Sequence, residues 1–95
     1  SIDPAIFSPD NDGFEDVLTM VYRFDQAGFV GTMSVFDIAG REVRKLLDNQ
    51  LLGVEGATSW DGILDDGSKG RIGPYIVLFE VFDLSGNTER YKKTS

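Results

Sequence analysis

The chain is predicted to fold as an all-β, antiparallel β-sandwich of about seven strands. Apolar and polar residues alternate with a period of two along several short segments, as they do in strands that bury one face. Turn residues separate these segments at short intervals, and helix-period patterns are nearly absent. Short strands punctuated in this way are typical of immunoglobulin-like and fibronectin III-like sandwiches.

Seven segments carry the strand pattern. We expect strands at 5–7, 17–24, 32–38, 41–47, 57–60, 75–83 and 88–93. In the second of these, Leu18, Met20, Tyr22 and Phe24 share the face that should be buried. The sixth has the strongest strand composition, and the last is polar enough for a sheet edge. The 95 residues suit a single domain over 1–95, which we expect to be excised from a longer protein.

Two predicted hairpin turns share one pattern, at 35–41 and 81–87. Each has Val-Phe-Asp followed by a Gly that can take positive φ, and the Asp can accept hydrogen bonds from its own turn. The repeat has two interpretations, which are convergent turn chemistry and duplication of half a sandwich. Both predict a hairpin at each position.

Composition excludes several function classes. The chain has neither His nor Cys, and 16 acidic against 9 basic residues give a net charge of -7. These absences exclude a Ser-His-Asp triad, a thiol nucleophile, a disulfide and a Cys or His zinc site. Scattered cations in an acidic chain do not suit a nucleic-acid partner. No apolar run reaches the ~18 residues of a bilayer span, so no membrane span is expected.

An acidic loop near the N-terminus is the first candidate site. Asp10, Asp12 and Asp16 can donate carboxylate oxygens to Ca²⁺, and Phe14 can donate its carbonyl, while Gly13 supplies a sharp bend. The spacing lacks the distal Glu of an EF-hand. The alternative is that Pro, Asn, Asp and Gly occur here because tight turns favour them. We therefore expect no required cofactor, with a structural Ca²⁺ as the one candidate.

The second candidate cluster surrounds Trp60. Pairing of Asp61 with Asp65 or Asp66 would give the acid and base of a glycoside hydrolase, but two tight turns beside one strand build no cleft. No enzymatic activity is therefore expected. Trp60 is interpreted as a core residue with Asp61 capping the following turn, and a glycan-stacking Trp60 on the surface is the alternative.

The third candidate is an apolar docking patch on the outer face of the last long strand. Ile76, Leu78 and Phe82 lie on one face of that strand, and Phe36 and Ile38 of the earlier hairpin extend it. A sandwich strand needs only one apolar face, and a second one usually marks a surface for another domain or chain.

In the alternative interpretation of this patch, the loop at 47–55 folds across the outer face and covers it. Leu51 and Leu52 would be the covering side chains.

Several motifs follow one another in a characteristic order. They are Phe7-Ser8-Pro9-Asp10-Asn11-Asp12-Gly13-Phe14-Glu15-Asp16, Val35-Phe36-Asp37-Ile38-Ala39-Gly40-Arg41-Glu42-Val43-Arg44, Trp60-Asp61-Gly62, Asp66-Gly67, Gly73-Pro74-Tyr75, Gly86-Asn87 and Lys92-Lys93. This order resembles the C-terminal domains of secreted Bacteroidetes proteins that are associated with type IX secretion or gliding motility. The Trp-Asp-Gly run is also similar to one in the immunoglobulin-like domain of the flagellar hook-capping protein.

This resemblance implies a non-catalytic accessory domain at the C-terminal end of a larger secreted protein. Such a domain would act in sorting, surface attachment or docking between domains, at an extracellular or outer cell-surface location. Its partners would be the secretion or cell-surface machinery, or neighbouring domains of the parent protein. A calcium- or glycan-binding module is the alternative function.

Overall fold

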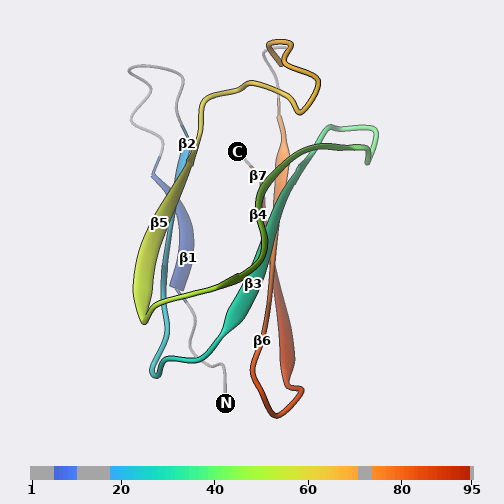
Figure 1. Cartoon of the computed structure of the whole chain (residues 1–95). Coiled ribbons are helices and arrows are strands. Elements are labelled where there is room, and N and C mark those ends of the chain that lie inside the picture. Colours follow the sequence, from blue (N-terminus) through green and yellow to red (C-terminus); the bar gives the residue numbers. More distant parts are fainter. Residues whose placement is uncertain (1–5, 11–17, 71–73, 95) are drawn as a thin grey trace.

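The computed structural model describes residues 6–10, 18–70 and 74–94, which form two antiparallel sheets packed face to face (Figure 1). The smaller sheet has the order β1-β2-β5, with β1 at Ile6–Asp10, β2 at Leu18–Arg23 and β5 at Glu55–Trp60. The all-β prediction is confirmed, and the described residues contain no helix.

The larger sheet has the order β4-β3-β6-β7. Its strands are β3 (Val30–Phe36), β4 (Glu42–Leu51), β6 (Ile76–Phe82) and β7 (Thr88–Thr94). In immunoglobulin constant domains the fourth strand belongs to the same sheet as the fifth strand and pairs with it. Here β4 pairs with β3 instead, which places the arrangement nearer the fibronectin III-like form of the predicted sandwich.

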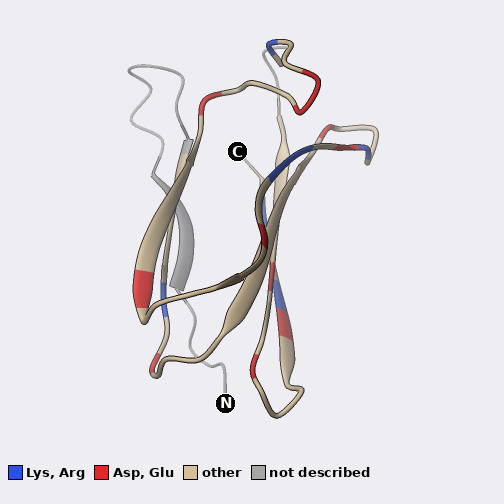
Figure 2. Cartoon of the chain, viewed as in Figure 1, with Lys and Arg blue, Asp and Glu red and all other residues tan. Residues whose placement is uncertain are grey.

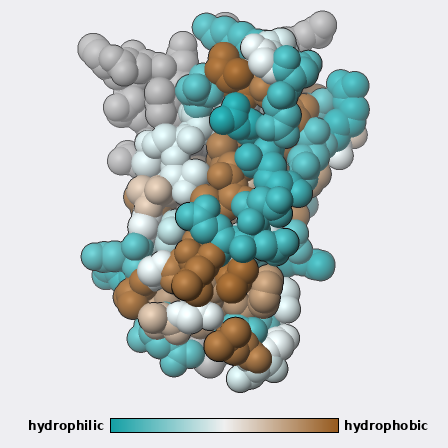
Figure 3. Space-filling model, in the orientation of Figure 1, coloured by the Kyte–Doolittle hydropathy of each residue, from teal (hydrophilic) through white to brown (hydrophobic). Residues whose placement is uncertain are grey.

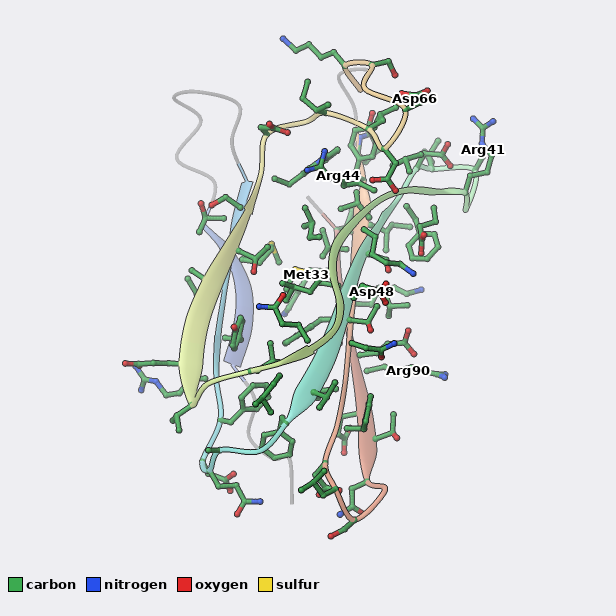
Figure 4. The ribbon with its side chains drawn as sticks, in the orientation of Figure 1. Met33, Arg41, Arg44, Asp48, Asp66 and Arg90 are labelled. Carbon is green, nitrogen blue, oxygen red and sulfur yellow. The ribbon has the colours of Figure 1, made fainter. Side chains whose placement is uncertain are left out.

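The core lies between the sheets and follows the predicted alternation. Met20 on β2 and Phe24 just after it are buried, and Tyr22 packs partly against the core, as the pattern predicts. The side chain of Leu18, the other residue of that predicted face, lies outside the described part of the structure. Figure 4 shows Met33 pointing into the space between the sheets. The buried apolar side chains are Met20, Phe24, Phe29, Met33, Val35, Leu47, Leu52, Trp60, Val77, Phe79 and Val81.

The fourth strand is longer than predicted, and the covering-loop interpretation is wrong. Residues 47–51 continue β4 along the edge of the sheet, so they widen the outer face instead of crossing it. Three register shifts against β3 accommodate the greater length of β4. Asn49 in this strand has a φ of 48°, which Asn tolerates better than most residues. Leu51 is 71% exposed, and Leu52 turns into the core.

The repeated turn pattern forms two hairpins with matching hydrogen bonds, as predicted. At 37–41 the carboxylate of Asp37 accepts the backbone N–H groups of Ala39 and Arg41. At 83–87 Asp83 accepts the equivalent N–H groups, from Ser85 and Asn87. The glycine of each turn has positive φ, 86° at residue 40 and 90° at residue 86, so the turn chemistry of the sequence is realised in both hairpins.

Candidate functional surface

One end of the sandwich is closed by a small hairpin at 62–70 that follows β5. The carbonyl of Ile63 accepts two hydrogen bonds, one from the Trp60 indole and one from the Arg44 guanidinium, each at 2.9 Å. The N–H of Asp65 donates to the carbonyl of Val43 at 2.8 Å, and the Arg44 and Asp65 side chains lie 3.8 Å apart. These contacts bind the hairpin to the start of β4 and cover the indole.

Trp60 is a core residue, so the glycan-stacking interpretation is wrong. Its side chain is only 5% exposed, and its ring lies edge-on to Tyr75 with the centroids 4.9 Å apart. A ring enclosed in this way has no free face for a sugar. Asp61 caps the next turn, as predicted, by accepting the N–H of Ile63 at 3.0 Å.

The acidic residues considered as a catalytic pair all have partners of their own. Asp66 accepts both the N–H and the hydroxyl of Ser68, at 2.8 and 2.6 Å. The hydroxyl, followed by the backbone N–H, lowers the pKa of Asp66 below its ordinary value, the opposite of what a general acid needs. Asp65 pairs with Arg44, and Asp61 accepts from its own turn. The arrangement therefore holds the chain in place.

A hollow of about 680 Å³ lies between the 62–70 hairpin and the β3–β4 turn. Ile38, Val43 and Tyr75 contribute apolar surface to it. Charged residues of both signs also line it, namely Arg41, Lys69, Asp37, Glu42 and Asp66. Ile38 lies in the β3–β4 turn beside the hollow, and it is 79% exposed. It therefore does not extend the strand face on which the docking patch was predicted.

The two hairpin aspartates have lowered pKa values for local reasons. The backbone N–H of Arg41, helped by its guanidinium, stabilises the ionised Asp37 carboxylate and lowers its pKa. The side-chain amide of Asn87, helped by backbone N–H groups, does the same for Asp83. Figure 2 shows that acidic residues gather in the turns at both ends of the sandwich. Many of the acidic residues behind the net negative charge therefore lie in turns, where their carboxylates accept hydrogen bonds.

Acid should remove the stabilisation that the ionised Asp83 carboxylate gives to its turn. The variant Asp83→Asn should therefore be less sensitive to acid than the wild type. The folded-state pKa of Asp83 lies below its ordinary value of 3.8. The contribution of ionised Asp83 to folding stability is therefore complete at pH values above the ordinary pKa. It is lost as the pH falls through the pKa that Asp83 has in the folded state. We expect thermal unfolding between about pH 7 and pH 2 to show a smaller loss of Tm in Asp83→Asn than in the wild type.

The matched control is Asp48→Asn, which removes the same charge from a carboxylate that has no hydrogen-bonding partner among the described residues. That variant should keep the acid sensitivity of the wild type. Equal acid sensitivity of Asp83→Asn and the wild type would show that the turn does not depend on the ionised carboxylate.

A row of polar residues crosses the outer face of the larger sheet. The N–H of Asn49 donates to the Thr32 hydroxyl at 3.0 Å, and Thr32 is in register with Glu80. Arg90 then pairs with Glu80 at 2.8 Å. Figure 4 shows Arg90 on the side of the sheet away from Met33. The row spans all four strands, so it divides the outer face into two parts.

The row also divides the predicted docking patch. Phe36 is in register with Ile76, and Leu78 follows on the same face, so these three half-buried side chains form one apolar group. We call this group the upper patch. Phe82 is 38% exposed and lies beyond Glu80, in register with Val30. It therefore belongs to a separate group.

The calcium prediction lies outside the part of the structure that can be described. Asp12, Phe14 and Asp16 fall in the segment 11–17, and Asp10 is described only as the last backbone position of β1. Among the side chains described, those of residues 19–70 and 74–94, no group of three acidic residues gathers as a metal site would require. The calcium loop stays a prediction.

The sequence did not predict the long-range contacts of this surface. The Arg44 contact with Ile63 and the Thr32 contact with Asn49 join residues on different strands or turns. No short motif signals either contact. Period-two alternation does place Thr32 and Glu80 on outer faces, which is the one available signal for the polar row.

The described residues hold no helix long and apolar enough to cross a bilayer. Comparisons of the chain with protein-family models, with curated proteins and with solved structures find no match.

Proposed function

We propose that this chain is a non-catalytic accessory domain of a secreted or cell-surface protein, and that it docks through the outer face of its larger sheet. The observation that carries the proposal is the upper patch. Phe36, Ile76 and Leu78 present apolar surface on the face opposite the core. A solvent-facing sheet surface is ordinarily polar, and apolar groups there usually serve contact with another chain or domain.

The use of the acidic side chains supports a role without catalysis. The carboxylates of Asp37, Asp61, Asp66 and Asp83 all accept N–H groups of their own turns. Such carboxylates fix loop geometry, and the lowered pKa values in three of these turns keep them ionised. The sorting role and the extracellular location rest on the motif resemblance of the sequence.

Attachment to the cell surface tests the proposal. A fluorescent reporter joined to the N-terminal side of residues 1–95 is expressed in a host with type IX secretion, beside the reporter alone. We expect the fusion in the surface fraction, where added protease can reach it, and the reporter alone inside the cell. A fusion that stays in the periplasm would rule out a sorting role.

A further inference from the structure

The four sheet edges differ in how they are protected against pairing with another strand. Native edges are commonly blocked by Pro, by Lys or Arg, or by bulges. Three of the edge strands carry such features. β1 contains Pro9, and β7 contains Arg90, Lys92 and Lys93. β4 contains Arg44 and Lys45 and has three register shifts against β3. The fourth, β5, has no Pro, Lys or Arg and pairs with β2 without a shift.

The ladder between β2 and β5 shows which backbone groups of β5 are free. The N–H of Phe24 donates to the carbonyl of Val54 at 2.7 Å, just before the six registered pairs. Bonded pairs alternate in an antiparallel ladder, so Glu55, Ala57 and Ser59 point their N–H and C=O groups away from β2. No backbone group of the described residues bonds to that outward row.

Apolar surface lies beside the same edge. Leu51, the last residue of β4, is 71% exposed, and Val54, directly before β5, is 45% exposed. Figure 3 shows apolar atoms gathered in the lower third of the side on which β4 and β5 lie. A shallow hollow of about 420 Å³ also lies over Val21 and Ala57 on the outer face of the smaller sheet. An open edge next to apolar surface is suited to strand addition.

We propose that two copies of this chain pair through β5, antiparallel and related by a two-fold axis at Ala57. This register places Ala57 opposite its counterpart and Glu55 opposite Ser59 of the partner subunit. No like charges face each other along the strand. The Ser59 hydroxyl, which lies 3.0 Å from the Thr19 hydroxyl, can accept from Thr19 and donate to a Glu55 carboxylate across the axis, and that carboxylate also pairs with Arg23 at 3.7 Å. Val54 comes into register with Trp60 of the partner subunit and loses exposure to water. The self-complementary register favours a second copy over an unrelated peptide.

Sedimentation equilibrium from micromolar to millimolar concentration tests the dimer. The wild type should move from 10.5 kDa toward twice that mass. Each copy carries a net charge of -7, so added salt should raise the dimer fraction by screening the repulsion. Ala57→Lys places two cations together at the axis and should weaken association at least about tenfold. The exposed position of Ala57 lets the variant fold, which circular dichroism verifies.

Thr88→Lys is the matched control, since it adds the same charge at an exposed position on the β7 edge. It should associate like the wild type. Ala57→Pro gives a second check, because Pro removes an outward N–H and leaves the bonds to β2 intact. A wild type that stays monomeric throughout, or an Ala57→Lys variant that associates as strongly as Thr88→Lys, would overturn the proposal.

Discussion

Replacing Phe79 by Ala should lower the free energy of unfolding by about 3–5 kcal/mol, because it opens a cavity where the two sheets meet. Phe79 is fully buried at the middle of β6. Its ring centroid lies 5.4 Å from that of Tyr22 and 6.4 Å from that of Phe24, both in or next to β2 of the facing sheet. Domains of this size are stable by only about 5–15 kcal/mol, so the loss should be severe.

Urea denaturation of Phe79→Ala beside Phe82→Ala measures this effect. Phe82 lies on the same strand but faces outward and is 38% exposed, so its loss should be about 1 kcal/mol. Equal losses at the two positions would contradict the assignment of inner and outer faces of β6.

Replacing Gly31 by Val should cost about 3 kcal/mol through overpacking, near the upper end of the usual range. A Cβ at this position would lie 2.7 Å from Leu52 Cδ1, 3.0 Å from Phe79 Cε1 and 3.3 Å from Val81 Cγ1. The close approach of these three core side chains leaves no room for a branched residue. We expect thermal unfolding to show a Tm lower by more than about 10 °C.

Gly53→Val is the control for Gly31→Val. The nearest atom to a Cβ at Gly53 is the carbonyl oxygen of Glu55 at 3.6 Å, an ordinary contact. That variant should change the free energy of unfolding by about 0.5 kcal/mol or less. If both variants were equally stable, the core around Gly31 would have to be looser than its contacts indicate.

The sequence predicted the features that depend on neighbouring residues. Period-two alternation placed Met20 and Phe24 in the core, because side-chain direction in a strand depends only on position along it. The hairpins at Asp37 and Asp83 followed from turn chemistry that spans five residues. Burial of Trp60 was also the preferred interpretation, because a sandwich of this size needs large side chains in its core.

The features that the sequence did not predict depend on pairing between distant strands. The extent of β4 follows from three register shifts, and no residue pattern fixes where a bulge falls. The polar row through Thr32 and Glu80 divides the docking patch because four strands align there. The sequence alone places Glu80 between Leu78 and Phe82 on one face, and the register of β6 with β3 and β7 shows that Glu80 belongs to a row that crosses the whole sheet.

The central claim is that the upper patch is the docking surface, and the surface-anchored fraction of the reporter fusion tests it most directly. Leu78→Thr makes the upper patch more polar and keeps a residue that favours strands. Phe82→Thr makes the same kind of change across the polar row, on the same strand and face. With both variants folded, Leu78→Thr should lower the surface-anchored fraction at least tenfold, which corresponds to roughly 1.4 kcal/mol of binding free energy. Phe82→Thr should leave that fraction unchanged. Anchoring that survives Leu78→Thr undiminished, or that fails equally in both variants, would contradict the claim.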